Sequence, residues 1–349
     1  MKLSLFSVTL WALSLASCQS PVTNPQTVTS SSSSLPLGQG SGVTVYAATA
    51  DGNGLLYYAG TTTTWKAADW SSYYNSSSPY SSSMTYPPVS DVTVSSGTIY
   101  AATAAGLLVG SRSSWARYQP GLTLTGVTVS GTNVFVSGPV QTTSGFYGLG
   151  LLSTSNLSTA PTALINAAKA ASATQWAPWG TGAAAATSLG LYYSSSPTTA
   201  GSYAPATTSS GTSLNAGTVN TVYAPASTLY VGTALGYSTT TSSSTFNWTN
   251  STGPGNVTGI LSTTVNSTPT LFLTTTSGLA YTQNGSSTWS TLISGVGANN
   301  IVRGATTATY YYANGSGGLG ILQIDSSGNI TQSSVLTWAN IAKVFVTIP

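Results

Sequence analysis

The segment DVTVSSGTIYAATAAGLLV, residues 91–109, holds three short runs of β-forming residues. The first run is Asp91–Ser95, the second is Ile99–Thr103, and the third follows directly from Gly106 and Leu107. Val, Ile, Tyr and Thr favour strands, whereas Glu, Lys, Gln and Arg, which usually cover helix surfaces, are scarce in the whole chain. The segment therefore predicts three consecutive short strands, and an all-β fold for the protein.

The third run recurs along the chain as a small residue, a Leu, and two or three residues rich in Tyr and aliphatic side chains. Leu holds the second place in all seven copies, and the copies are spaced by 52, 44, 40, 44, 44 and 40 residues. Internal repeats of about this length indicate a repeat architecture. The copies begin at Gly54, Gly106, Gly150, Gly190, Ala234, Gly278 and Gly318.

Most units carry further β-type runs around this core. One or two runs precede the Gly-Leu strand, and the run that follows it often contains a Trp, as at Trp65, Trp115, Trp248 and Trp289. Four short strands per unit of about 44 residues are the signature of a β-propeller blade. The seven units predict a seven-bladed propeller of four-stranded blades over residues 42–349. A parallel β-solenoid is the competing interpretation, although its coils are usually shorter.

The two ends of the repeat region predict how the ring closes. The first unit lacks an evident first strand, whereas the run 343–348 follows a seventh unit that is already complete. We expect this C-terminal strand to complete the first blade and so to remove an exposed sheet edge.

Charged residues are rare in this 349-residue chain, which has 7 Lys plus Arg, 4 Asp plus Glu and no His. All four acids are Asp. Without His or Glu the chain cannot form a Ser-His-Asp triad, a His-ligated zinc site or a Glu pair for glycoside hydrolysis. A formal charge of +3 provides no basic patch for nucleic acid. We therefore expect no catalytic residues, no metal site, no cofactor and no nucleic-acid partner.

The N-terminus has the features of an export signal. Lys2 precedes an apolar run, Leu3–Leu15, which is too short to span a bilayer, and small residues follow it. The segment LASC, residues 15–18, resembles the lipobox of bacterial lipoproteins, and Cys18 is the only cysteine. The resemblance implies a signal peptide over 1–17, lipidation of Cys18, a flexible Ser/Thr/Pro tether over 18–41, and, with Gln19 as the second residue, the outer membrane. The alternative is an ordinary signal peptide with a chance Cys near the cleavage site.

One hairpin resembles the Asp-box or BNR repeat of sialidase-like propellers. Residues 282–289, TQNGSSTW, follow its pattern with Asn in place of the Asp and Ser in place of one Gly. Photosystem assembly factors and sortilin-type proteins are related propellers, and these degenerate boxes do not choose among them. Sialidases require three arginines and a glutamate, and this chain offers only Arg112, Arg117 and Arg303, without Glu. We expect Arg112 and Arg117, which flank Trp115, to lie away from the central channel.

Two aromatic stretches interrupt the repeat and are candidate ligand-binding regions. The first is an insertion over 69–88 with Trp70, Tyr73 and Tyr74, and the second contains Trp176 and Trp179. Trp and Tyr among Ser, Thr and Asn suit neutral sugars or peptide. Packing of these aromatics between blades is the alternative for each stretch. The leading functional hypothesis is an envelope-anchored, non-catalytic propeller that binds or scaffolds a protein or polysaccharide. A degenerate sialidase-like glycan hydrolase or lectin is the alternative.

The low acid content also predicts tolerance of acid, because acid denaturation mainly protonates carboxylates that are paired in the native state. Compositional drift in a low-complexity surface protein explains the same composition. Asp51 begins the segment DGNG, residues 51–54, and Asp325 begins the segment DSSGN, residues 325–329. Asp, Asn and Gly are residues of tight turns, and we favour turns over calcium loops because each segment carries a single carboxylate.

Overall fold

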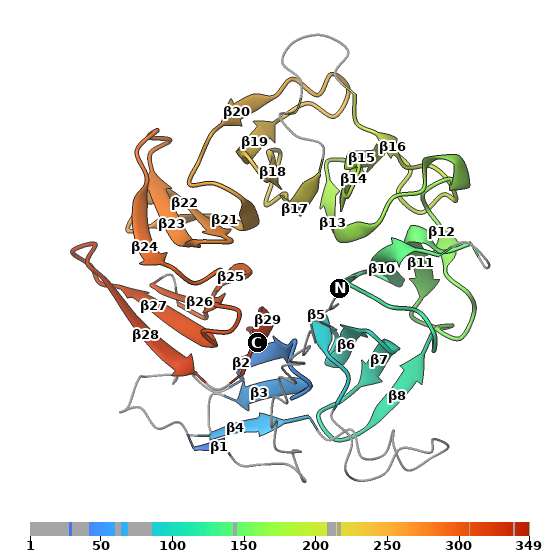
Figure 1. Cartoon of the computed structure of the whole chain (residues 1–349), viewed down its shortest axis with the longest axis horizontal. Coiled ribbons are helices and arrows are strands. Elements are labelled where there is room, and N and C mark those ends of the chain that lie inside the picture. The colour runs from blue at the N-terminus through green and yellow to red at the C-terminus, as the bar shows by residue number, and fades with distance from the viewer. Residues whose placement is uncertain are drawn as a thin grey trace, which may run out of the picture.

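The computed structural model describes residues 28–29, 42–59, 64–68, 86–141, 145–207, 214, 218–306, 308–337 and 339–348. These residues form seven antiparallel sheets arranged around a central axis (Figure 1). Helix in the described part is limited to one 3₁₀ turn, Ala167–Lys169. The prediction of an all-β, seven-bladed propeller with four-stranded blades is confirmed.

The strands of each blade are given from the innermost strand outward. Blade 1 contains β29 (Ile341–Thr347), β2 (Thr44–Thr49), β3 (Leu55–Ala59), β4 (Thr64–Ala67) and β1 (Val28–Thr29). Blade 2 contains β5 (Val89–Ser95), β6 (Thr98–Thr103), β7 (Gly106–Gly110) and β8 (Trp115–Tyr118). Blade 3 contains β9 (Gly126–Ser130), β10 (Asn133–Val140), β11 (Tyr147–Ser153) and β12 (Thr162–Ala163). Blade 4 contains β13 (Ala173–Trp179), β14 (Gly182–Thr187), β15 (Gly190–Ser194) and β16 (Ala204–Pro205). Blade 5 contains β17 (Val219–Tyr223), β18 (Leu229–Thr233), β19 (Gly236–Thr240) and β20 (Thr249–Ser251). Blade 6 contains β21 (Val257–Val265), β22 (Thr268–Thr275), β23 (Gly278–Gln283) and β24 (Ser290–Ser294). Blade 7 contains β25 (Asn300–Arg303), β26 (Thr309–Ala313), β27 (Leu319–Ile324) and β28 (Ile330–Leu336).

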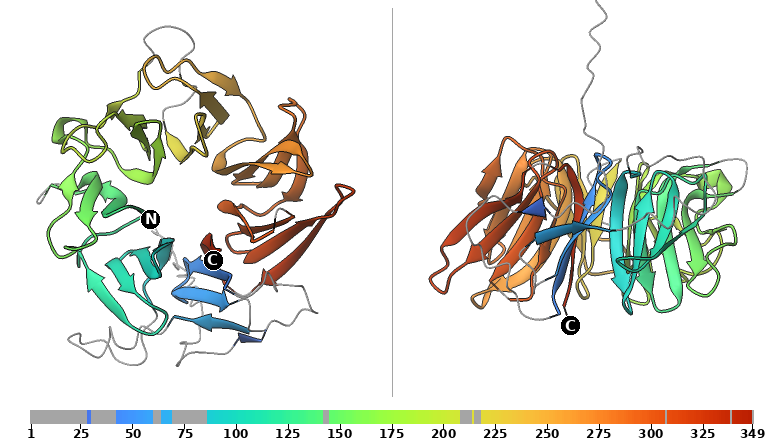
Figure 2. Two further views of the ribbon diagram at one scale, coloured as in Figure 1. Left: turned by 180° about the vertical axis from the view of Figure 1, so that it is seen from behind. Right: turned by 90° about the horizontal axis from the view of Figure 1, so that it is seen from below.

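The ring closes through the C-terminal strand, as predicted. β29 pairs antiparallel with β2, with Val346 opposite Val45 and Val344 opposite Ala47. Figure 2 shows the C-terminal end of the chain beside the first blade. A strand from the end of the chain thus forms the inner edge of the first blade. The structure adds one feature to the predicted tether, because β1 pairs antiparallel with β4 on the outer side of the same blade.

The core consists of separate apolar clusters between neighbouring blades. The six residues of β2 are all buried, and successive side chains point to opposite faces of the strand. Val45 and Ala47 pack in a cluster with blade 7, whereas Tyr46 and Ala48 pack in a cluster with blade 2. Each blade is therefore buried on both faces, which explains the nearly continuous runs of apolar residues in the second strands.

A repeated hairpin connects the second and third strands of most blades. In blades 2, 4, 5 and 6 a Thr ends the second strand, and its hydroxyl donates to the carbonyl of a Gly three residues later, at 2.7–3.2 Å. The four pairs are Thr103 with Gly106, Thr187 with Gly190, Thr233 with Gly236, and Thr275 with Gly278. Each Gly has a positive φ, which side chains rarely adopt. The recurring small residue is therefore a turn requirement.

Two of the seven predicted repeat copies are out of register by two residues. In blade 3 the carbonyl of Leu149 accepts from Leu164 N, as that of Leu191 accepts from Ala206 N in blade 4. The third copy therefore begins at Gly148. In blade 5 the turn Gly is Gly236, and Leu235 lies in the turn with 57% of its surface exposed. Because Tyr237 takes the usual place of Leu in blade 5, a search for Leu at that position selects Leu235 instead.

Candidate binding site in the central channel

The innermost strands of the blades surround the central channel (Figure 1). In five blades this strand contains a β-bulge near its beginning, where one residue is skipped in the pairing with the second strand. The skipped residues are Ser90, Thr174, Asn220, Thr258 and Ala342. A bulge bends the strand and redirects its side chains. Here three of the five skipped side chains contact the next blade.

Side-chain bonds join every neighbouring pair of blades at this level of the channel. Apart from Lys343, the side chains are short and polar. They belong to the innermost strands or to the residue just before them, and they mostly bond to backbone atoms of the next blade. Around the ring the bonds are Lys343 to Asp91 (2.9 Å), Val127 N to Asp91 (3.0 Å), Thr125 to Ala173 O (2.8 Å), Thr174 to Asn220 O (3.1 Å), Asn220 to Val257 O (2.9 Å), Thr258 to Ala298 O, and Asn300 to Val344 O (2.9 Å).

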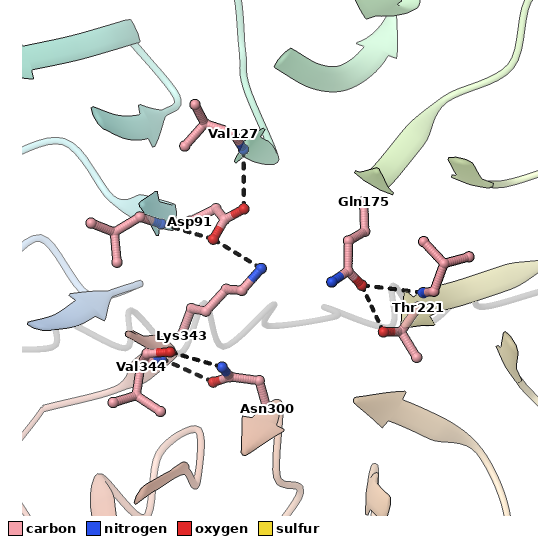
Figure 3. A network of polar contacts seen from close by, with 9 residues as sticks. Asp91, Val127, Gln175, Thr221, Asn300, Lys343 and Val344 are labelled. Carbon is pink, nitrogen blue, oxygen red and sulfur yellow. Dashed lines mark hydrogen bonds and ion pairs between the residues drawn. The ribbon is translucent and has the colours of Figure 1, made fainter. Parts of the chain in front are cut away.

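Gln175 adds a second bond between blades 4 and 5. Its Oε1 accepts from the Thr221 hydroxyl at 2.6 Å and from Val222 N at 3.3 Å. A backbone N–H can only donate, so the atom that faces Val222 must be the amide oxygen. The amide nitrogen is thereby directed toward the open space at the middle of the ring (Figure 3).

Asp91 and Lys343 form the ion pair that the structure shows within its described residues. The Asp91 carboxylate is nearly buried, with 5% of its side chain exposed, and Lys343 is 25% exposed. One carboxylate oxygen accepts from Val92 N at 2.8 Å and from Lys343, and the other accepts from Val127 N. Both carboxylate oxygens of Asp91 therefore accept hydrogen bonds, and the donors come from blades 1, 2 and 3.

A cavity of about 320 Å³ opens on the side of the channel formed by blades 4 to 7 and β29. Its lining combines amides, hydroxyls and apolar side chains with two cations, Arg303 and Lys343, and contains no carboxylate. Tyr223 also lines it, and burial raises the pKa of the Tyr223 hydroxyl, to which the neighbouring Tyr230 adds. Such a lining suits a small polar ligand that offers hydrogen-bond acceptors.

Trp176 and Trp179, two predicted ligand-binding residues, are not on the surface. They are 5% and 3% exposed. Trp176 stacks on Phe135 at 3.8 Å and donates to the Tyr203 hydroxyl at 2.6 Å, while Trp179 donates to Ser227 O at 2.8 Å. The structure therefore places both indoles in the packing between blades, which was the alternative interpretation.

The physical reason lies in the neighbouring strand. β14 carries four consecutive alanines, residues 183–186, and all four are fully buried. Trp176 shares its cluster with Ala183 and Ala185, and Trp179 shares the next cluster with Ala184 and Ala186. The large rings fill the volume that the alanines leave, as dense packing requires. The alanine run is the sequence signal that indicates this role.

The other predicted site residues, Trp70, Tyr73, Tyr74 and Cys18, lie outside the described residues. The structure therefore does not test the aromatic insertion or the lipidation site. In the described part no helix is long and apolar enough to cross a membrane.

The two Asp-Gly segments form turns. Asp51 accepts from Asn53 Nδ2 and from Asn340 N, and Asp325 accepts from Ser327 N and Asn329 N. Hydrogen bonds from the Asn329 side chain and backbone lower the pKa of the exposed Asp325 carboxyl. Among the described residues no cluster of potential metal ligands occurs.

The hairpin over 282–289 lies between the third and fourth strands of blade 6, where an Asp box is expected. The Thr282 hydroxyl donates to Ser286 O at 2.8 Å, and Trp289 packs edge-on against Tyr237 of blade 5. This segment therefore stabilises the turn and the contact between blades.

Two of the three arginines lie away from the central channel, as the sequence predicted. Arg112 precedes the outer strand β8 and Arg117 lies on it, away from the channel. Arg112 donates to the Thr44 hydroxyl at 2.7 Å and lies 5.1 Å from the centre of the Tyr57 ring. Only Arg303, on the innermost strand β25, reaches the cavity.

Comparison with known proteins shows the fold. No protein-family model matches the chain, and no curated protein sequence matches it. Similar solved structures include PorZ, a surface component of the type-IX secretion system of Porphyromonas gingivalis (TM-score 0.55, 14% identity), the dihydro-heme d1 dehydrogenase NirN (0.55, 14%) and the computationally designed Ika8 protein (0.56, 9%). The alignments cover 84%, 87% and 90% of this chain, but 37%, 65% and 90% of the other three. The chain thus spans little more than a third of PorZ, and at these identities the likeness is one of fold.

Proposed function

We propose that the protein is an exported propeller, anchored to the cell envelope by a lipid on Cys18, that binds or scaffolds a protein or polysaccharide and catalyses no reaction. The observation that carries this proposal is the closed circle of bonds between blades around the channel. The polar side chains of the innermost strands, which in an enzyme would be available for chemistry, are largely engaged in holding the ring together.

The charge distribution supports a binding role over catalysis. General acid–base chemistry needs a titratable group within hydrogen-bond reach of the substrate. The cavity lining contains no carboxylate, and the nearby Asp91 is engaged by Lys343 and two backbone N–H groups. A cavity whose lining contains no carboxylate suits recognition.

The setting in other propellers is compatible with this proposal. PorZ is a bacterial surface component, and a similar propeller occurs in the extracellular domain of the putative hybrid two-component system BT4673 from B. thetaiotaomicron (TM-score 0.54, 13% identity). The degenerate Asp-box pattern at 282–289 is likewise compatible with membership of the BNR-repeat propellers.

Three experiments test the proposal. A glycan array combined with glycosidase assays on residues 19–349 should reveal binding without turnover, and hydrolysis of any glycoside would overturn the non-catalytic role. A pull-down from envelope extract with the same protein should identify a macromolecular partner. For the anchor, C18A should release the exported protein from the membrane fraction, whereas retention of C18A in that fraction would contradict lipidation.

The alternative is a degenerate sialidase-like lectin or glycan hydrolase. Arg303 favours it, because a guanidinium at a channel cavity can bind the carboxylate of an acidic sugar. Array binding restricted to acidic glycans would favour the lectin, and cleavage of those glycans would favour the hydrolase.

A further inference from the structure

At the level of Gln175 and Lys343, two nitrogen-bound donor groups face the centre of the ring (Figure 3). Gln175 Oε1 accepts from two donors of blade 5, so its Nε2 faces the channel. Figure 3 shows this nitrogen and the Lys343 ammonium on the same open central space.

Lys343 retains donor capacity despite its ion pair. An ammonium carries three N–H donors, and Asp91 Oδ1, at 2.9 Å, occupies one direction. A quarter of the side chain is exposed, so the remaining N–H groups are accessible from the channel. Asp91 neutralises the charge of the Lys343 ammonium only in part on the side of the cavity. Its carboxylate is nearly buried, lies on the far side of the ammonium and also accepts from Val127 N.

Arg303 adds a second cation to the same cavity. It is the last residue of β25, is exposed, and forms no ion pair within the described residues. It lies near the Tyr310 hydroxyl, whose pKa is raised by burial and lowered in part by the Arg303 charge. In a chain with seven basic residues, two therefore converge on a cavity that has no carboxylate in its lining.

We propose that the central cavity is an anion site, in which Gln175 Nε2, the Lys343 ammonium and the Arg303 guanidinium bind the oxygens of a carboxylate, phosphate or sulfate group. An oxyanion offers only acceptors, which matches the donor groups of these three side chains. The volume of about 320 Å³ is sufficient for a small organic acid or for the acidic group of a larger ligand that enters from the channel. The site depends neither on the lipid anchor nor on a macromolecular partner.

The sharpest test is Q175E in the purified full chain in detergent. The glutamate keeps an oxygen for Thr221 and Val222, so the bond between the blades remains. The channel-facing donor, however, becomes a negatively charged acceptor. Q332E is the matched control, because Gln332 is exposed on the outer strand β28 and the substitution changes the net charge by the same amount. Titration calorimetry with phosphate, sulfate and citrate at constant ionic strength, with chloride as the reference anion, measures the affinity.

We expect saturable binding of at least one of these anions, one per chain, that weakens by about tenfold or more in Q175E and changes less than about twofold in Q332E. The preference between citrate and the inorganic anions identifies the group as a carboxylate or as a phosphate or sulfate. R303Q provides an independent readout, since Arg303 forms no ion pair within the described residues, and it should weaken binding by about threefold or more, while R117Q should not. Absence of saturable binding, or equal affinity in Q175E and Q332E, would overturn the proposal.

Discussion

The ammonium of Lys343 lies 2.9 Å from the carboxylate of Asp91, and this contact joins the last strand of the chain to the second blade. The same carboxylate accepts from Val127 N of the third blade. One side chain thus connects three consecutive blades, beginning with the strand that closes the ring. In a protein with four acidic residues, one of them is placed where the ends of the chain must be held together.

Removal of this carboxylate should destabilise the propeller. In D91A, Val127 N–H and Lys343 lose a nearly buried acceptor, and we expect a loss of about 2 to 3 kcal/mol in the free energy of unfolding. D91N keeps one oxygen for the backbone donors and should lose less. Urea denaturation measures both, with D325N in the exposed turn as the control. Equal stability of D91A and the wild type would show that closure does not depend on this contact.

Stability should change little in acid. Protonation of all four Asp raises the formal charge only from +3 to +7 over 349 residues. The depressed pKa of Asp325 contributes stability above its ordinary value of 3.8, which is lost as the pH falls through the lowered value. Because this carboxyl is exposed, its loss is small, and the loss from the Asp91 ion pair is bounded by the cost of D91A. The melting temperature should stay nearly constant from about pH 7 to about pH 2, and a decrease of many degrees would contradict the hypothesis of acid tolerance.

Alkaline conditions should have the larger effect, because burial raises the pKa of Tyr311 to about 12, with a smaller contribution from Tyr58. A raised pKa favours the protonated, folded form, so its contribution is complete below the ordinary value of 10.0 and is lost as the pH rises from 10 toward 12. Burial also raises the pKa of several other tyrosines, including Tyr203 and Tyr312. Thermal unfolding should therefore occur at progressively lower temperature above about pH 10.

Y311F separates the contribution of Tyr311 from that of the other tyrosines. The Tyr311 hydroxyl is buried without a hydrogen-bond partner among the described residues, so its removal at neutral pH should be neutral or stabilising by up to about 1 kcal/mol. Above pH 10 the variant should lose less stability than the wild type. Melting curves of both proteins at neutral pH and at about pH 11 measure the difference, and parallel pH profiles would argue against a strongly raised pKa at Tyr311.

The fold could be predicted because its repeats are visible within a single amino-acid sequence. Seven copies of a strand that begins with a small residue and Leu, most of them with β-type runs before it, are sufficient for the blade count, and the unpaired run at 343–348 indicates the closure. The register of two copies was wrong because Leu marks a buried strand position, whereas the hairpin is determined by the Thr and Gly that flank the turn. The turn chemistry is the more reliable marker.

The site could be predicted only in part, because its residues act through bulges. Asp91, Gln175 and Lys343 each follow the skipped residue of an innermost strand, and this position is visible only once the pairing is known. Aromatic residues suggested Trp176 and Trp179 instead. Their burial follows from the alanines of β14, a long-range packing relation that composition and spacing do not express.

The packing role of Trp176 can be tested directly. W176F removes the bond to the Tyr203 hydroxyl and leaves that hydroxyl buried, while part of the stacking on Phe135 remains. We expect a loss of about 2 to 3 kcal/mol from the smaller ring and the unpaired hydroxyl together. The double variant W176F/Y203F should recover about 1 kcal/mol of this, because no buried hydroxyl is then left without a partner. Urea denaturation of the two single variants and the double variant gives the coupling energy. If the effects of the two substitutions on the free energy of unfolding are additive, the loss in W176F comes from the smaller ring alone. If W176F loses ligand binding without losing stability, Trp176 is a ligand-binding residue after all.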